Sequence, residues 1–121
     1  MKVLIPTNNT TIKDGICASF GRAPHFMIVD LQSGEKSFIQ NAGATSGSGA
    51  GIKAAQSVVD SKVNAMITPR IGKNAADVIS ASGITIYKSE SESVEDNLKL
   101  FSDEKLAVLT DIHPGFHGHR A

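Results

Sequence analysis

Cysteine, aromatic residues and net charge are all scarce in this chain of 121 residues. Its single cysteine excludes an internal disulfide, and a domain of this length needs none, because it buries roughly two-thirds of its unfolded surface. Twelve basic and twelve acidic residues leave a net charge of zero, so no overall field attracts nucleic acid or an anionic membrane. No apolar run approaches the roughly 20 residues of a membrane span. We therefore expect one soluble, cytoplasmic domain that binds neither nucleic acid nor membrane.

Short apolar runs separated by turn residues predict five strands. The first run ends at Pro6 and is typical of a buried central strand. Ser33 and Gly34 lie between two later runs and predict a hairpin. The last two runs flank a helical segment, which predicts a parallel pair joined by a right-handed crossover. The predicted strands are 2–6, 25–31, 35–40, 64–68 and 84–88.

Helical spacing of apolar residues predicts about three helices, over 52–59, 73–82 and 94–101. Gly83 follows the second as a C-cap glycine, and Ser93 precedes the third as an N-cap, with acidic residues in its first turn. Hairpin-linked strands come first and crossover-linked strands follow. This order predicts an α/β fold with a mixed five-stranded sheet, in one domain over residues 1–108, followed by a tail over 109–121.

A run of small residues, from Gly43 to Gly51, precedes the first predicted helix. Its spacing matches neither the phosphate loop of nucleotide hydrolases nor the dinucleotide fingerprint. Three functions stay open for Gly47, Gly49 and Gly51: a nucleotide site, an edge that binds an anion or acidic cofactor at the helix start, or a structural connection.

The segment from Cys17 to Phe26 concentrates ligand-capable residues. It holds the only cysteine, together with His25 and Arg22. Thiolate and imidazole are ligands for iron, zinc and iron–sulfur clusters, and Arg22 would balance an anionic cluster. One cysteine cannot supply four thiolates, and its alternative role is that of a small buried hydrophobic residue.

The tail contains three further histidines, His113, His117 and His119, which indicate either a divalent metal site or a disordered terminus. No nucleophilic triad motif appears. A metal-dependent nuclease needs clustered carboxylates on central strands, but segments 2–6 and 64–68 contain no acid and Asp30 is isolated. These observations argue against triad catalysis and against a metal-dependent nuclease.

Three segments together resemble the dinitrogenase iron-molybdenum cofactor biosynthesis family, which includes NifX, NafY and the carboxy-terminal domain of NifB. They are Phe20-Gly-Arg-Ala-Pro-His-Phe26, Gly49-Ala-Gly-Ile-Lys-Ala-Ala-Gln56 and Gly83-Ile-Thr-Ile-Tyr87. The resemblance covers about residues 1–108. It implies a ribonuclease-H-like fold, and a non-enzymatic carrier of an iron–sulfur cluster or an iron–molybdenum cofactor precursor that works with cofactor donor and acceptor proteins.

The chain departs from this family where Ser19 replaces a histidine that often precedes Phe-Gly. Two alternatives follow: either the ligands have moved to Cys17 and His25, or cluster binding is lost and a regulatory module that binds small anions or proteins remains. Asn41 would donate a hydrogen bond to a sulfide, and Arg70 would add positive charge at the end of the sheet. An exposed strand edge would allow a homodimer.

Overall fold

Five strands form one mixed sheet in the computed structural model, which describes residues 1–8, 15–17, 20–41, 43 and 49–109. The strand order is β3-β2-β1-β4-β5, so the first strand lies at the centre, as predicted. β1 pairs antiparallel with β2 and parallel with β4, and β4 pairs parallel with β5. The strands are β1 (Lys2–Thr7), β2 (His25–Asp30), β3 (Lys36–Gln40), β4 (Ala65–Thr68) and β5 (Thr85–Lys88).

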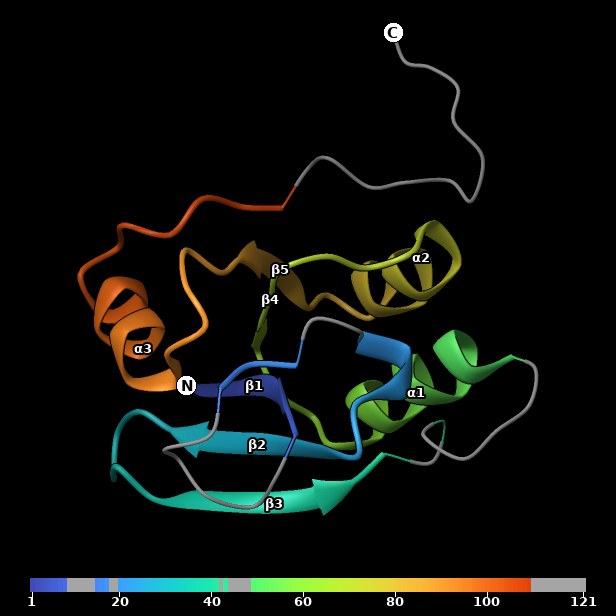
Figure 1. The fold of residues 1–121 in the computed structure, drawn as a ribbon, viewed down its shortest axis with the longest axis horizontal. Coiled ribbons are helices and arrows are strands. Elements are labelled where there is room, and N and C mark those ends of the chain that lie inside the picture. Colours follow the sequence, from blue (N-terminus) through green and yellow to red (C-terminus); the bar gives the residue numbers. More distant parts are fainter. Residues whose placement is uncertain (9–14, 18–19, 42, 44–48, 110–121) are drawn as a thin grey trace, which may run out of the picture.

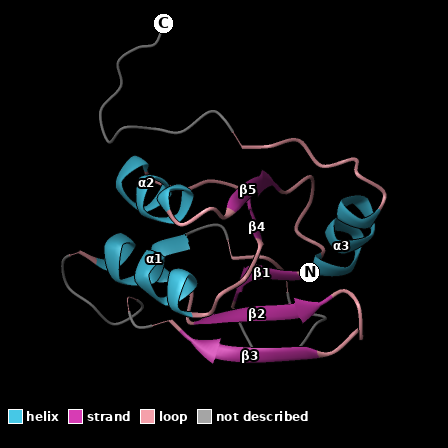
Figure 2. Ribbon diagram, turned by 180° about the vertical axis from the view of Figure 1, so that it is seen from behind, coloured by secondary structure: helices cyan, strands magenta, loops and turns pink. Residues whose placement is uncertain are grey.

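Three α-helices and one short 3₁₀ helix cover this sheet (Figures 1 and 2). They are η1 (Phe20–Arg22), α1 (Ala50–Asp60), α2 (Lys73–Ala81) and α3 (Val94–Ser102). The mixed sheet with its three helices confirms the predicted α/β class, and the ribonuclease-H-like label is compatible with it. Among the described residues, no helix is long and apolar enough to cross a membrane.

Successive side chains along each strand point to opposite faces of the sheet, so the core is divided between these two faces. Leu4, Phe26 and Met66 pack with residues of α1 and α2, whereas their neighbours Val3, Met27 and Ile67 pack with Val94 of α3 and its surroundings. All six strand residues are at most 1% exposed. Because full burial of such a side chain contributes about 1.5–3 kcal/mol, these continuous apolar strands hold both helical layers.

Local chemistry fixes the ends of the helices as predicted. The Ser93 hydroxyl accepts a hydrogen bond from the Asp96 backbone N–H at 3.1 Å and caps α3. Gly83 follows α2 with a φ of 84°, a conformation that glycine adopts without steric cost. Helix α1 begins two residues before its predicted start, directly after Gly49, which has a φ of 70°.

Pro6 does not end the first strand, which continues to Thr7. The Leu31 N–H donates to the Met1 carbonyl. Because hydrogen-bonded positions alternate in an antiparallel pair, the backbone N–H and C=O groups of the odd-numbered residues of β1 bond β2, and those of the even-numbered residues face β4. Pairing with β4 extends only over Val3 and Leu4, so the missing N–H of Pro6 faces a side where the ladder has already ended.

The β5 edge of the sheet is covered by the segment that follows α3. The Lys88 N–H donates to the Ala107 carbonyl at 2.9 Å, and the Leu109 N–H donates to the Ile86 carbonyl at 2.8 Å. Leu109 is 8% exposed and belongs to the core beneath α2. The packed part of the chain therefore includes Leu109, the first residue of the predicted tail.

We expect Leu109→Ala to lower the free energy of unfolding by about 2–3 kcal/mol, because it removes a buried side chain. The neighbouring Val108 is 50% exposed. Val108→Ala should therefore change stability by less than about 0.5 kcal/mol. Urea unfolding of both variants checks the difference, and equal effects would contradict the inclusion of Leu109 in the core.

Candidate functional site

Helices α1 and α2 both begin at the carboxyl end of the central parallel strands. α2 directly follows β4, and α1 follows β3, which runs parallel to β1 because each is antiparallel to β2. Their N-caps are Gly49 and Gly72, which supply no side-chain hydrogen bond, and neither first turn contains an acidic residue. Neither the N-cap nor the first turn of these two helices therefore compensates the positive end of the helix dipole.

Helix α3 shows the opposite arrangement. It also begins at the carboxyl end of a strand, but Ser93 caps it, and Glu95 and Asp96 occupy its first turn. An anion is therefore favoured at the starts of α1 and α2 and disfavoured at the start of α3. The acidic stretch that contains α3 is an exposed helix face, with Val94 and Asn97 buried beneath it.

Small residues bring η1, α1 and α2 together at one point. A Cβ placed on Gly21 of η1 would lie 3.3 Å from both the N and the Cα of Gly51. A Cβ placed on Gly51 would lie 3.9 Å from the Cβ of Ala75 in the first turn of α2. The Phe-Gly-Arg segment therefore contacts the start of α1, and the start of α1 contacts that of α2.

Asn41 and Gly43 hold the connection to α1 in place. The Asn41 amide nitrogen donates to the carbonyls of Gly21 and Ala23 at 3.2 and 2.8 Å, and its oxygen accepts from the Gly43 N–H at 2.9 Å. Both N–H donors of Asn41 are thus used within the protein. A Cβ on Gly43 would lie 2.3 Å from the Ala50 carbonyl oxygen, so only glycine fits there.

Cys17 lies at the point where the sheet connections diverge, between the ends of β1 and β4. Its N–H donates to the Pro6 carbonyl at 2.9 Å, and the preceding Ile16 forms a bridge with Thr7. The thiol is 9% exposed and packs in the cluster that contains Phe20 and Phe26. In open α/β sheets, ligands bind at such a divergence.

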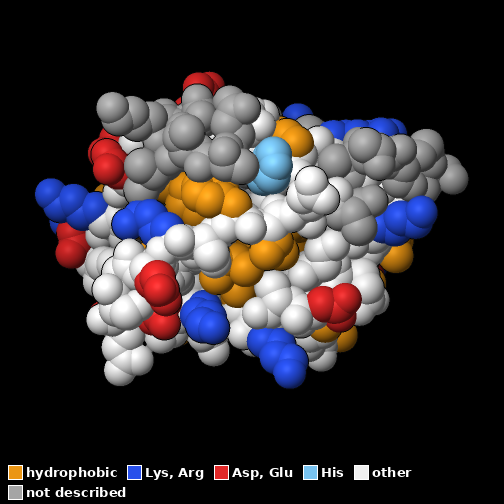
Figure 3. Space-filling model, turned by 90° about the horizontal axis from the view of Figure 1, so that it is seen from below, with side chains coloured by type: hydrophobic (Ala, Val, Ile, Leu, Met, Phe, Trp, Pro, Cys, Tyr) orange, Lys and Arg blue, Asp and Glu red, His pale blue; other side chains and the backbone are white. Residues whose placement is uncertain are grey.

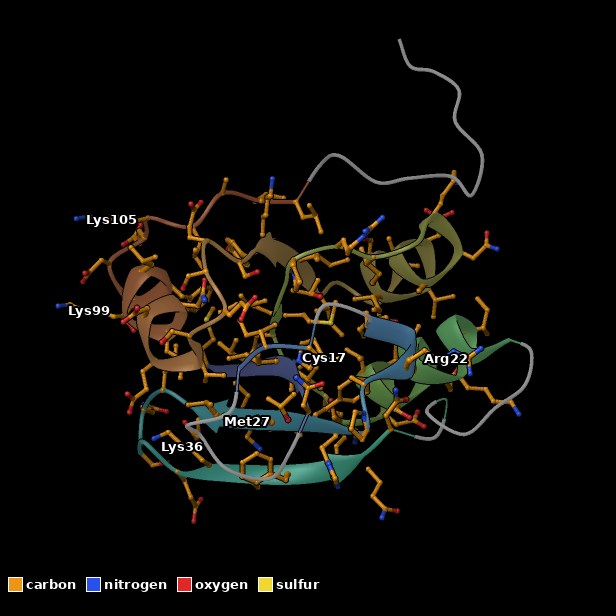
Figure 4. All side chains as sticks on the ribbon, viewed as in Figure 1. Cys17, Arg22, Met27, Lys36, Lys99 and Lys105 are labelled. Carbon is orange, nitrogen blue, oxygen red and sulfur yellow. The ribbon has the colours of Figure 1, made fainter. Side chains whose placement is uncertain are left out.

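Basic side chains surround the two helix starts. Arg22, Lys53, Arg70 and Lys73 are all exposed, and Figure 4 shows Arg22 beside α1. Lys73 forms an ion pair with Asp77, with Nζ and Oδ2 2.7 Å apart, so part of its charge is neutralised. The Arg70 carbonyl accepts a hydrogen bond from the buried Thr68 hydroxyl at 3.2 Å, which anchors the loop between β4 and α2.

His25 lies on the other face of the sheet from Cys17. It precedes Phe26 in β2, so its side chain is on the face of Met27 and Val29, whereas Cys17 packs with Phe26. The His25 Nδ1 atom is buried, and no group in the part of the chain that the structure describes forms a hydrogen bond with it. The described residues contain no group of three or more histidine, cysteine or acidic side chains arranged for a metal ion.

Sequence reasoning grouped Cys17 and His25 on one surface. The bridge between Thr7 and Ile16 instead leaves Cys17 on the face of Phe26, whereas His25 is on the opposite face by its place in β2. Sequence reasoning also missed the packing roles of Gly21 and Gly43. The signal for these roles was the glycines themselves, since close backbone approach requires them. Other predicted site residues lie outside the described residues: Ser19, Gly47, His113, His117 and His119.

Comparison with known proteins gives a consistent result. A family model described as dinitrogenase iron-molybdenum cofactor matches residues 1–104. An uncharacterised protein of Methanocaldococcus jannaschii is 34% identical over 109 residues, which are 88% of this chain and 89% of the relative.

Two solved structures have the same fold. The apo form of the orange protein from Desulfovibrio gigas superposes with a TM-score of 0.84 at 25% identity, covering 90% of this chain and 92% of that one. A NifB-like protein from Thermotoga superposes with a TM-score of 0.80 at 29% identity, covering 95% of this chain and 98% of that one.

Substitutions at two glycines of the site should have opposite effects. Gly43→Ala forces backbone apart and should destabilise the protein by about 1–3 kcal/mol. The added methyl group of Gly51→Ala meets only the Ala75 Cβ, at an ordinary contact distance of 3.9 Å. Because alanine favours the helix more than glycine does, this variant should be neutral or stabilising by up to about 1 kcal/mol. Thermal unfolding of both variants measures the contrast. A tolerated Gly43→Ala would contradict the close contact between the connection and α1.

Proposed function

Because the chain belongs to the dinitrogenase iron-molybdenum cofactor family, we propose that it binds and carries an iron–sulfur cluster or an iron–molybdenum cofactor precursor. The cargo binds against the starts of α1 and α2. The observation that carries this location is the contact of Gly51 with both Gly21 and the first turn of α2, which joins two uncapped helix starts to the family motif.

Electrostatics supports this location. Clusters of iron and sulfide are commonly net anions, and each helix N-terminus acts as roughly half a positive charge. Arg22 from η1 and Arg70 from the β4–α2 loop add positive charge around the same point. Gly49 and Gly51 place no side chain over the first turn of α1, which would let a bulky ligand approach its backbone N–H groups.

In this proposal Cys17 supplies the thiolate ligand, from the core cluster that it shares with Phe20 of η1. It is the only cysteine, so the remaining iron ligands come from the sulfides of the cargo and from the donor and acceptor proteins that exchange it. Ser19, Gly47 and the tail histidines stay candidates for the remainder of the site. Asn41 shapes the loop instead of donating to a sulfide, because its two N–H groups already donate to backbone carbonyls.

We assign no catalytic step to the protein. Asp30 is at the opposite end of β2 from His25, where its carboxylate accepts from the Gln32 N–H at 3.0 Å. It is thus remote from the starts of α1 and α2, and β1 and β4 contain no acidic residue. The described residues therefore offer no paired carboxylates at the carboxyl end of the central strands for two-metal chemistry.

A second candidate is a regulatory module that binds a small anion or a protein at the same helix starts. The observation that favours it is the single thiol, with no three-ligand group among the described residues. Protein purified without oxygen would then contain no iron, and an inorganic anion such as phosphate would raise its melting temperature. Iron and sulfide in equal amounts in the purified protein would instead support the carrier.

Cys17→Ala tests the proposed ligand. We expect anaerobic reconstitution with iron and sulfide to give charge-transfer absorption that this variant loses by at least about half, because one of few iron ligands is removed. His25→Gln is the matched control, since His25 lies on the other face of the sheet, and its absorption should equal that of the unchanged protein. Unchanged absorption in Cys17→Ala would remove Cys17 from the site.

Charge neutralisation tests the proposed location. Arg22→Gln and Arg70→Gln should each weaken retention of the reconstituted cluster by about two- to fivefold, because each removes one positive charge beside an anion. Lys99→Gln on α3 carries the same change of net charge at an exposed position. Iron retained after gel filtration measures the effect, and equal losses in all three variants would exclude a site at α1 and α2.

A further inference from the structure

The two edge strands of the sheet, β5 and β3, differ in whether another segment of the described chain covers them. Residues 107–109 cover the edge at β5, whereas β3 forms the other edge, and no described segment pairs with its outer side. Figure 3 views the molecule from the side where β3 lies in Figure 1, and it shows hydrophobic surface bordered by charged side chains. Edge strands in monomers commonly carry proline, a bulge or central charges, but β3 has only Lys36, at its end.

The hydrogen bonds of the hairpin identify which groups of β3 face outward. The Asp30 N–H donates to the Glu35 carbonyl, and the Asn41 N–H donates to the Pro24 carbonyl. Hydrogen-bonded positions alternate along an antiparallel pair. Because Glu35 and Asn41 are such positions, the backbone groups of the odd-numbered residues of β3 bond β2. The N–H and C=O groups of Lys36, Phe38 and Gln40 therefore point away from the sheet.

We propose that β3 pairs with β3 of a second copy of this chain, antiparallel and centred on Phe38. In this register Phe38 lies opposite Phe38, and Lys36 lies opposite Gln40 on each side of the two-fold axis. All three outward N–H groups of each copy then meet outward carbonyls of the other. The two sheets become one continuous sheet, and the closed symmetry leaves no β3 edge for further association.

Side chains support a second copy as the occupant. Lys36, Phe38 and Gln40 share one face of β3, so the pairing stacks two half-buried phenylalanines between two Lys–Gln contacts. No like charges face each other, and each Gln40 amide oxygen can accept from the Lys36 ammonium opposite. A shift that instead centres the pair on Lys36 would place the two lysines opposite each other and would use fewer backbone groups.

Charge changes at the exposed Gln40 test the proposal without loss of packing. Light scattering after gel filtration should give twice the chain mass of 12.7 kDa for the unchanged protein. Gln40→Lys places like charges opposite Lys36 twice per interface and should raise the dissociation constant about tenfold. Gln40→Glu places opposite charges there and should lower it by a similar factor.

Gln56→Lys and Gln56→Glu on α1 repeat the same changes of net charge at an exposed residue outside β3 and should leave association unchanged. Phe38→Lys and Phe38→Glu provide a second test: each alone should be monomeric, and an equal mixture should form heterodimers. A monomer at every concentration, an equal response to all four glutamine variants, or a dimer that the Gln40 variants do not affect would overturn the proposal. It does not depend on cluster binding.

Discussion

Close packing of backbone against backbone at Gly21, Gly43 and Gly51 is the constraint on which the site depends. Gly21 and Gly43 let η1 and the connection from β3 rest directly on the first turn of α1, where Gly21 meets the backbone of Gly51. A side chain at Gly43 would push the connection away from α1 and separate the Phe-Gly-Arg segment from the helix starts. The site is thus built by the absence of side chains, which leaves backbone N–H groups as its main recognition surface.

The central strand adds a second constraint at the same end of the sheet. The ladder toward β4 ends at Leu4, before Pro6, and the Pro6 carbonyl accepts from the Cys17 N–H. The chain segment that follows therefore fills the divergence between β1 and β4, with Ile16 on one face and Cys17 on the other. The Pro6 carbonyl and the bridge between Thr7 and Ile16 together position the only thiol of the protein.

Features governed by local chemistry were predictable from the sequence. The Ser93 cap and the turn at Gly83 each follow from residues within a few positions of one another, and the parallel crossover follows from the order of strand, helix and strand over 65–88. The relation between Cys17 and His25 was not predictable, because it depends on a single bridge at Ile16 outside the regular strands. The role of Asn41 was missed for a similar reason, since its hydrogen-bond partners at Gly21 and Ala23 are remote in sequence.

The contrast among the helix starts links this architecture to function, because α3 alone among the three described α-helices carries a side-chain cap and acidic residues in its first turn. Amide NMR of anaerobically reconstituted protein tests the link most directly, since a paramagnetic cluster broadens nearby signals. The account predicts loss of the signals of Gly21, Arg22, Gly51 and Lys73, with those of α3 and the β2–β3 hairpin retained. Broadening centred on His25 and α3, or bound iron with no broadening at α1 and α2, would contradict it.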